Sequence, residues 1–187
     1  MSILGVPLTV LLVSITMLVA AVIDGWKLKV PNWLTFPFVM SGWIYHVLTE
    51  GAWGIQSSLL GTVVGLGLLL VPYVIGGMGA GDVKLFAGVG AWMGPQVTFY
   101  AFCVSAVVGG ILAVFQVTYR GLRARDWDIV RKSWDRFQTV GVEVMTIRDP
   151  GQLAELAAAR KPTAMLLPYG IPLAIGTIGY FFWSGLL

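Results

Sequence analysis

Long apolar runs recur along nearly the whole chain, and they constrain the fold more than any other feature of the sequence. A helix needs roughly 20 apolar residues to cross the hydrocarbon layer of a bilayer, and several runs approach or exceed this length. Of the 187 residues, 57% are hydrophobic and only 11% are charged, which is more apolar surface than one water-soluble core of this size could bury. The sequence therefore predicts an all-α membrane protein that forms one domain over residues 1–187.

We expect six transmembrane helices, because six apolar runs are separated by short polar or glycine-containing stretches. They cover residues 4–23, 33–48, 57–75, 83–93, 96–117 and 164–187. The first run is too long, and has too little positive charge before it, for a cleaved signal peptide, so we expect it to remain in the protein. The fourth run is short and could be a re-entrant segment, but the Gly94-Pro95 pair after it favours a short span followed by a tight turn.

The lysines and arginines predict the orientation, because they all fall on one side of this arrangement. Lys27 and Lys29 follow the first span, Lys84 follows the third, and the other nine lie between the fifth and sixth. Positively charged loops stay in the cytoplasm. We therefore expect both termini outside, with Glu50 the only charge in the loops on that side.

Residues 119–163 form the only sizeable polar region, predicted to be a cytoplasmic basic loop between the fifth and sixth helices. Trp127, Val130, Trp134 and Phe137 recur in it at helical spacing among basic residues. This pattern is typical of an amphipathic helix lying on the inner leaflet. An interfacial anchor is the simpler interpretation, and a partner-binding surface is the alternative.

Single residues exclude several classes of site. Cys103 is the only cysteine and His46 the only histidine, so neither a disulfide framework nor a cysteine-ligated zinc site can form. We expect both side chains to serve packing or, for His46, the membrane interface. The tryptophans near span ends, Trp92 among them, are expected to be interfacial anchors. We expect no metal and no cofactor. We expect no nucleic-acid partner either, because in a membrane protein the position of the charges matters more than the net charge of +3.

Two acidic residues, Asp24 and Asp82, sit at the ends of apolar spans, and the predicted topology places both at the cytoplasmic membrane boundary. An ionisable group in or near hydrocarbon is costly unless it is partnered or hydrated, which makes such a residue a functional candidate. Each could instead simply cap the end of its span. The two aspartates are separated by an even number of predicted crossings and so return to the same face of the membrane. This favours a function for the pair.

The stretch Gly76-Gly77-Met78-Gly79-Ala80-Gly81 directly precedes Asp82. So many glycines make a poor helix, so we expect a loop shaped by its backbone that another chain can approach closely, with Asp82 at the following helix start. A phosphate-binding loop is excluded, since its Lys-Ser/Thr pair is missing and the spacing is wrong.

These residues resemble a known family. The string from Gly79 to Asp82 resembles the GxGD motif of the prepilin and preflagellin peptidases, and the longer string from Gly77 to Leu85 strongly resembles the prepilin peptidase form. Asp24, followed shortly by Val30-Pro31-Asn32, resembles the other half of that site, and Pro168-Tyr169-Gly170 resembles the start of the family's last span. Without the N-terminal, cysteine-paired portion associated with N-methylation, the chain is most similar to the short Tad/Flp-type enzymes. Methyltransferase activity is therefore not expected.

The resemblance implies an aspartic endopeptidase of the bacterial cytoplasmic (inner) membrane, with Asp24 and Asp82 as its catalytic pair. Its expected partners are the lipid bilayer and pilin or pseudopilin precursors, whose basic leader is cut off at the cytoplasmic face after a glycine. The residues expected to bind substrate or shape the loops are Gly79, Gly81, Lys84, Pro31 and Asn32. Which precursor is cut, and whether the enzyme forms a homo-oligomer, stay open.

The main alternative is a small proton- or cation-coupled carrier, because paired intramembrane acids also serve as relay sites. The acids of a carrier should lie near the middle of the bilayer, whereas Asp24 and Asp82 are expected at one boundary, and no inverted repeat is apparent. A purely structural scaffold is a third interpretation, but it leaves the glycine-rich loop unexplained.

Overall fold

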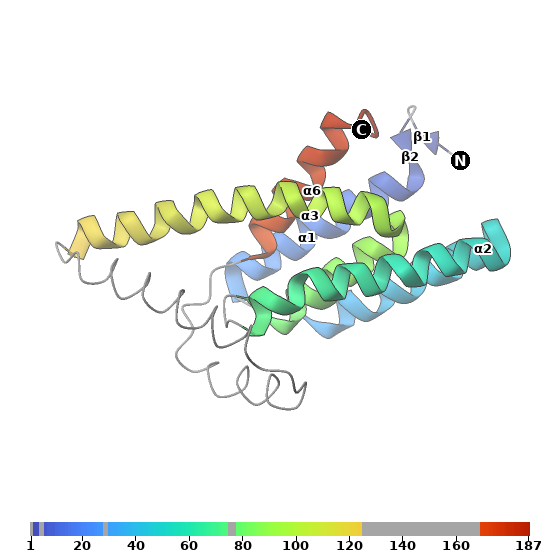
Figure 1. Ribbon diagram of the computed structural model, residues 1–187, viewed down its shortest axis with the longest axis horizontal. Helices are drawn as coiled ribbons and strands as arrows, with labels where there is room; N and C mark the ends of the chain where they lie inside the picture. The colour runs from blue at the N-terminus through green and yellow to red at the C-terminus, as the bar shows by residue number, and fades with distance from the viewer. Residues whose placement is uncertain (1, 4–5, 28–29, 75–77, 125–168) are drawn as a thin grey trace.

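The computed structural model describes residues 2–3, 6–27, 30–74, 78–124 and 169–187, which form four helices and one small hairpin (Figure 1). The helices are α1 (Leu8–Lys27), α2 (Asn32–Val74), α3 (Ala80–Ala124) and α6 (Gly170–Trp183), and the antiparallel strands are β1 (Ser2–Ile3) and β2 (Val6–Pro7). The predicted helical fold class is confirmed, with the short hairpin as an addition. Three of the helices are long and apolar enough to cross a membrane. The number of crossings stays a prediction.

Helix α2 folds back on itself at Gly51. The indole N–H of Trp43 donates a 3.0 Å hydrogen bond to the hydroxyl oxygen of Thr62, 19 residues further along the chain. In a straight helix these two residues would stand about 28 Å apart, so the two halves of α2 run side by side. Gly51 has a φ of 65°, a backbone conformation that glycine adopts far more readily than other residues, and this permits the reversal.

Helix α3 reverses in the same way at Gly94, where φ is 74°. The rings of Phe86 and Phe102 lie on opposite sides of this point, yet their centroids are only 6.4 Å apart. A straight helix would separate the two residues by about 24 Å. The tight turn predicted at Gly94-Pro95 is therefore confirmed.

Glycines allow α2 and α3 to pack backbone against backbone. A Cβ atom added to Gly61 would collide with the carbonyl group of Gly90, and one added to Gly90 would collide with that of Gly61. One added to Gly65 would lie 2.6 Å from the carbonyl oxygen of Phe86. Water supplies no hydrophobic driving force between helices in lipid, so close contact of small residues is a main source of their association.

Two side chains of α3 differ in exposure from what the sequence predicted. Trp92 was expected to be an interfacial anchor, but it is only 5% exposed, and its indole N–H donates a 2.9 Å hydrogen bond to the carbonyl oxygen of Phe38. Cys103 was expected to pack inside, but its side chain is exposed. Both residues belong to α3, where the apolar sequence does not reveal which side faces the other helices. Trp26 and Trp53 are more than 80% exposed, as an interfacial position requires.

Three predicted boundaries also differ. Helix α1 begins at Leu8 rather than at residue 4, because the hairpin occupies the residues before it, and it continues to Lys27, so Asp24 lies inside the helix. Helix α3 begins at Ala80 rather than at residue 83 and continues to Ala124, so the first residues of the predicted loop 119–163 are helical. The predicted amphipathic helix from Trp127 to Phe137 lies outside the described residues.

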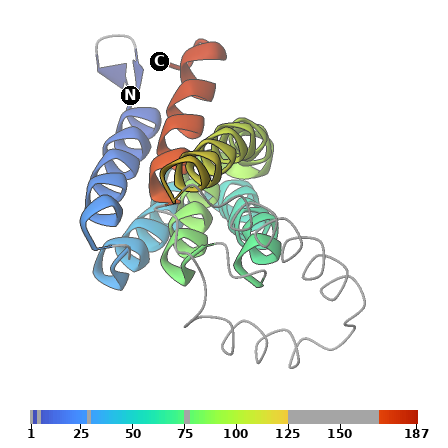
Figure 2. The ribbon, with the colours of Figure 1, turned by 90° about the vertical axis from the view of Figure 1, so that its left-hand side faces the viewer.

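The two chain ends lie close together at one end of the molecule in both views (Figures 1 and 2). The last turn of α1 and the first turns of α3 and α6 come together toward the opposite end (Figure 1). The glycine-rich stretch therefore leads into a place where three helix ends meet.

Candidate active site

Asp24 lies in the last turn of α1 and is only 3% exposed. Its Oδ2 atom accepts a 2.8 Å hydrogen bond from the backbone N–H of Gly170, the first residue of α6. The first N–H groups of a helix have no partner within that helix, and their end of the helix dipole favours a negative charge. Asp24, which belongs to a different helix, therefore supplies a hydrogen-bond acceptor for the first N–H group of α6. The same bond orients the Asp24 carboxyl group.

Position 170 has little room for a side chain. A Cβ atom there would lie 3.0 Å from both the Cβ and the Oδ2 atoms of Asp24, which is tighter than most real contacts of a Cβ atom. Asp24 or α6 would have to shift to accept it. The sequence had marked Pro168-Tyr169-Gly170 only as a resemblance to the family, and nothing in that motif reveals that its glycine binds Asp24.

Asp82 lies in the first turn of α3 and is also 3% exposed. Its Oδ2 atom accepts a 3.1 Å hydrogen bond from the N–H of Gly79, and its own N–H donates a 3.1 Å hydrogen bond to the carbonyl oxygen of Gly79. The bond from the Gly79 N–H to the Asp82 side chain is one half of a capping box, in which the side chain of the third helical residue accepts the N–H of the capping residue. Gly79 has no side chain for the other half, and its backbone carbonyl oxygen accepts the N–H of Asp82 instead. These two bonds also explain why α3 starts earlier than predicted.

The second oxygen of Asp82, Oδ1, is buried and has no hydrogen-bond partner among the described residues. A buried carboxylate oxygen without a partner is unfavourable and is unusual in a folded protein. The two aspartates lie within electrostatic range of each other, and Asp82 is also within range of the Tyr169 hydroxyl. The structure thus brings the two predicted residues together, 58 positions apart in sequence.

Gly81 allows the segment between α1 and α2 to lie next to Asp82. A Cβ atom at Gly81 would lie 2.5 Å from the carbonyl oxygen of Val30 and 3.1 Å from its backbone nitrogen. The segment before α2 therefore passes directly against the first turn of α3. The glycines were expected to let another chain approach closely, and at Gly81 the structure shows a segment of the same chain in that place.

The other three predicted residues join the beginnings of α2 and α3. The carbonyl oxygen of Pro31 accepts the N–H groups of Leu34 and Thr35, and so begins α2. The ammonium group of Lys84 donates a 3.1 Å hydrogen bond to the Asn32 side chain and lies 4.9 Å from the centroid of the Phe36 ring. These contacts fit a loop-shaping role, and substrate binding by the same residues stays a prediction.

No group of three or more possible metal-ligating side chains occurs among the residues that the structure describes. His46 lies away from the aspartates, and its Nε2 atom is 3.1 Å from the carbonyl oxygen of Trp92. Its partly buried ring also packs edge-on against Tyr45. The prediction that His46 is a packing residue agrees with these contacts.

Comparison with known proteins assigns the family. The description of the type IV leader peptidase family matches residues 11–114, which is more than half of the chain and includes both aspartates. The chain belongs to this family. Together with its apolar helices, this membership indicates a bacterial inner-membrane protein.

The curated relatives that match this chain share one name, prepilin leader peptidase/N-methyltransferase. The protein from Neisseria gonorrhoeae is 34% identical over 124 residues, which cover 63% of this chain and 41% of the relative. The protein from Vibrio cholerae is 32% identical over 48% of this chain and 38% of its own length, and the one from Aeromonas hydrophila is 29% identical over 60% of this chain and 41% of its own.

The matched part thus spans about two fifths of the length of these relatives. The methyltransferase activity in their name is a property of those longer proteins. No solved structure gives a significant match to the chain.

Proposed function

We propose that Asp24 and Asp82 are the catalytic pair of a membrane-embedded aspartic endopeptidase that removes the leader from pilin-like precursors. The observation that carries the proposal is the arrangement of the two carboxyl groups. Both are buried, they come from different helices, and they lie within electrostatic range of each other. Each is held through one oxygen by a backbone N–H group. The family membership supports the same chemistry.

Two carboxyl groups that interact in a buried site are costly to ionise together, so in the proposed mechanism one of them is ionised and the other is protonated. The ionised partner removes a proton from a water molecule as the water oxygen attacks the peptide carbonyl carbon. The protonated partner donates a hydrogen bond to the carbonyl oxygen, where negative charge develops. When the C–N bond breaks, the leaving nitrogen receives a proton from the pair, which restores the starting state.

The proposed substrates are pilin or pseudopilin precursors with a basic leader before an apolar helix, since the curated relatives are named for prepilin leader cleavage. The carbonyl groups of a helix are occupied by its own hydrogen bonds, so the scissile segment must unwind before the water can attack. The glycine-rich loop before Asp82 is the proposed place for this unwound segment. The bilayer is the second partner, and a homo-oligomer is compatible with this function.

The site is proposed to lie at the cytoplasmic boundary of the inner membrane, with six crossings and both termini outside. Reversals at Gly51 and Gly94 divide α2 and α3 into two stretches each, which with α1 and α6 makes six helical stretches. An even number of crossings agrees with the two chain ends lying together, away from the last turn of α1 and the first turn of α3 (Figure 1). The distribution of lysines and arginines then sets the direction.

A leader-cleavage assay tests the proposal. The purified chain is incubated with pilin-like precursors of its own genome, and the new N-terminus of each product is sequenced. We expect Asp24→Asn and Asp82→Asn each to lower the cleavage rate by at least about a thousandfold, because the amide keeps the shape of the side chain but cannot carry the proton. The double variant should be scarcely slower than either single one, since the two groups act as a unit.

Glu50→Gln is the matched control, because it makes the same chemical change at an exposed acid of α2 that does not contact the aspartates. It should cleave at the wild-type rate. A folded Asp24→Asn or Asp82→Asn protein that still cleaves at the wild-type rate would exclude the aspartic mechanism and favour the carrier.

A further inference from the structure

The reversal of α3 at Gly94 leaves carbonyl groups that need hydrogen-bond donors from elsewhere. In a continuous helix the carbonyl oxygen of Ala91 would accept the N–H of Pro95, but proline has no N–H. Trp92, the next residue, lies in the same last turn, where a helix leaves its carbonyl groups without internal partners. Such a group is costly in the hydrocarbon layer, because no water can bind it there.

The length of this half of α3 places the reversal inside the hydrocarbon layer. Asp82 and Gly94 are 12 residues apart, and this part of the helix rises about 18 Å. The hydrocarbon layer is about 30 Å thick. With Asp82 at the cytoplasmic boundary, as proposed above, the reversal lies roughly 12 Å short of the other boundary. The protein itself must therefore supply the donors.

Two side chains of α2 supply them. The hydroxyl group of Ser58, which is fully buried, donates a 2.5 Å hydrogen bond to the carbonyl oxygen of Ala91. The Nε2 atom of His46 lies 3.1 Å from the carbonyl oxygen of Trp92. Since a carbonyl oxygen can only accept, this bond requires a hydrogen on Nε2. His46 and Ser58 come from the two halves of α2, and we call the pair the α3 clamp.

The α3 clamp fixes how far the first half of α3 lies along α2. Gly61 and Gly90 let the two helices come close, but glycines have no projecting side chains that would stop one helix from sliding along the other. Hydrogen bonds to two successive carbonyl groups stop such sliding, because each bond joins particular atoms at a narrow range of distances. Asp82 lies on the same half of α3, so any shift of this half along its axis also moves the carboxyl group.

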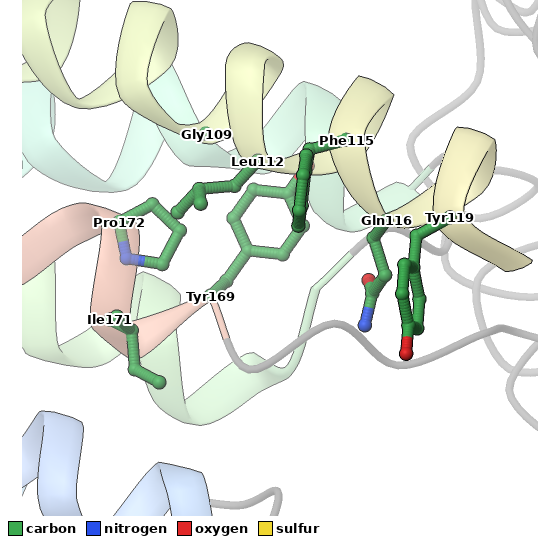
Figure 3. Close-up of a pocket in the computed structure, with 8 residues that line it drawn as sticks. All are labelled: Gly109, Leu112, Phe115, Gln116, Tyr119, Tyr169, Ile171 and Pro172. Carbon is green, nitrogen blue, oxygen red and sulfur yellow. The ribbon is translucent and has the colours of Figure 1, made fainter.

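The α6 side of the site gives α3 less support. Helix α3 packs more extensively on α2 than on α6. A cavity of about 290 Å³ lies between the second half of α3 and the start of α6, where Tyr169 and Pro172 line it (Figure 3). Asp24 is bound to this same start of α6, through Gly170. The position of Asp82 relative to Asp24 therefore depends on how α2 holds α3.

We propose that His46 and Ser58 are positioning residues of the proposed protease, which hold Asp82 in its place relative to Asp24 from the far end of the same half of α3. The inference rests on the proposed function. Ala91 lies about 14 Å along the helix from Asp82, so the α3 clamp does not touch the reacting atoms. Its loss should lower the rate of the chemical step and leave substrate binding unchanged.

Substitutions of His46 test its hydrogen bond separately from its ring. The side-chain nitrogen of glutamine can take the place of Nε2, whereas that of asparagine corresponds to Nδ1 and does not reach Trp92. We expect kcat for leader cleavage to stay within about twofold of wild type in His46→Gln and to fall about tenfold in His46→Asn and His46→Leu, with KM unchanged. Ser58→Ala should lower kcat by a similar factor.

Thr49→Ala is the matched control. The exposed Thr49 hydroxyl donates a 2.9 Å hydrogen bond to the carbonyl oxygen of Tyr45, so this bond stays within α2. The substitution removes the same kind of bond without freeing α3, and it should leave cleavage at the wild-type rate. All rates are compared per folded molecule after size-exclusion chromatography in one detergent. If His46→Leu does not fold, the comparison of His46→Gln with His46→Asn decides.

Equal losses of kcat in His46→Gln and His46→Asn would assign His46 to packing and overturn the inference. Wild-type kcat in His46→Asn and Ser58→Ala would overturn it too, as would a raised KM at unchanged kcat. Failure of the proposed function is a different result, in which the wild-type protein does not cut the precursor or Asp82→Asn still cuts it.

Discussion

Asp24 and Asp82 are held by the same device, a backbone N–H group bound to one carboxylate oxygen, at 2.8 Å from Gly170 and 3.1 Å from Gly79. Backbone donors have no rotamers of their own, so they hold a carboxyl group more rigidly than a side chain would. A catalytic constellation must be held to within about 0.5 Å of its working geometry. The glycines around the site therefore contribute by positioning the two carboxyl groups, although they carry no reactive group themselves.

Gly170→Ala tests this positioning. The added methyl group would press on Asp24 from 3.0 Å, so we expect kcat to fall by roughly a hundredfold with little change in KM, as expected for a misplaced catalytic group. Gly179→Ala, with open space at its Cβ position on the same helix, is the control and should cleave normally. Wild-type kcat in a folded Gly170→Ala protein would show that the hydrogen bond to Asp24 is dispensable.

Substitutions of Lys84 and Asn32 can distinguish a loop-shaping role of these residues from substrate binding. If the 3.1 Å hydrogen bond holds the starts of α2 and α3 together, Lys84→Ala and Asn32→Ala should lower cleavage by similar, few-fold factors. The double variant should then be no worse than either single one, which is the signature of a coupled pair in a double-mutant cycle. A raised KM in Lys84→Ala alone would instead assign the lysine to the substrate.

At the scale of elements, α2 and α3 depend on reversals and close contacts that hydrophobicity does not encode. Each helix turns at a glycine with positive φ, and the halves that meet do so where Gly61 faces Gly90. The helix–helix contact brings the first half of α3 into the bundle, and Asp82 lies in the first turn of that half. Packing between these helices thus supports the position of the carboxyl group.

Gly61→Ala should destabilise the protein by about 1–3 kcal/mol, since its methyl group would have to displace the backbone of α3. Gly67→Ala makes the same change in the same half of α2 where no atom lies within 4 Å, and should be neutral or slightly stabilising because alanine favours helix. Thermal unfolding in one detergent at one scan rate compares them. Equal midpoints for the two variants would contradict a close backbone contact.

At the scale of the whole molecule, the chain ends lie at one end of the bundle and the three helix ends that carry the site lie toward the other (Figures 1 and 2). A site built at one end of a helical bundle is suited to a substrate that is partly in lipid and partly in water. The orientation in the membrane therefore bears on the proposed function, because the proposed leader cleavage takes place on the cytoplasmic side only.

The orientation can be measured by cysteine labelling in intact cells. Cys103 is first replaced as Cys103→Ala, so that each introduced cysteine is the only thiol in the chain. In that background an impermeant outside reagent should label Glu50→Cys, while Lys29→Cys and Arg131→Cys should react only after the cells are opened. Labelling of Arg131→Cys in intact cells would overturn the proposed topology.

Much of this protein could be predicted from its sequence. Apolar length alone predicts helices in a bilayer, because an unpaired backbone group is too costly in hydrocarbon. The turn at Gly94-Pro95 followed from local backbone chemistry, and Asp24 and Asp82 stood out because charge is rare in such a chain. The motif around Asp82 indicated the family that the comparison then assigned.

The tertiary structure alone decided which atoms meet. An all-apolar helix shows no clear periodicity, so the sequence could not tell that Trp92 faces inward and Cys103 outward. Nor could the sequence show that the backbone of Gly170 binds Asp24. The two residues are 146 positions apart, and glycine has no side chain whose chemistry would indicate the contact. Composition and spacing act along the chain, whereas the surroundings of the two carboxyl groups arise from surfaces that meet only after the helices pack.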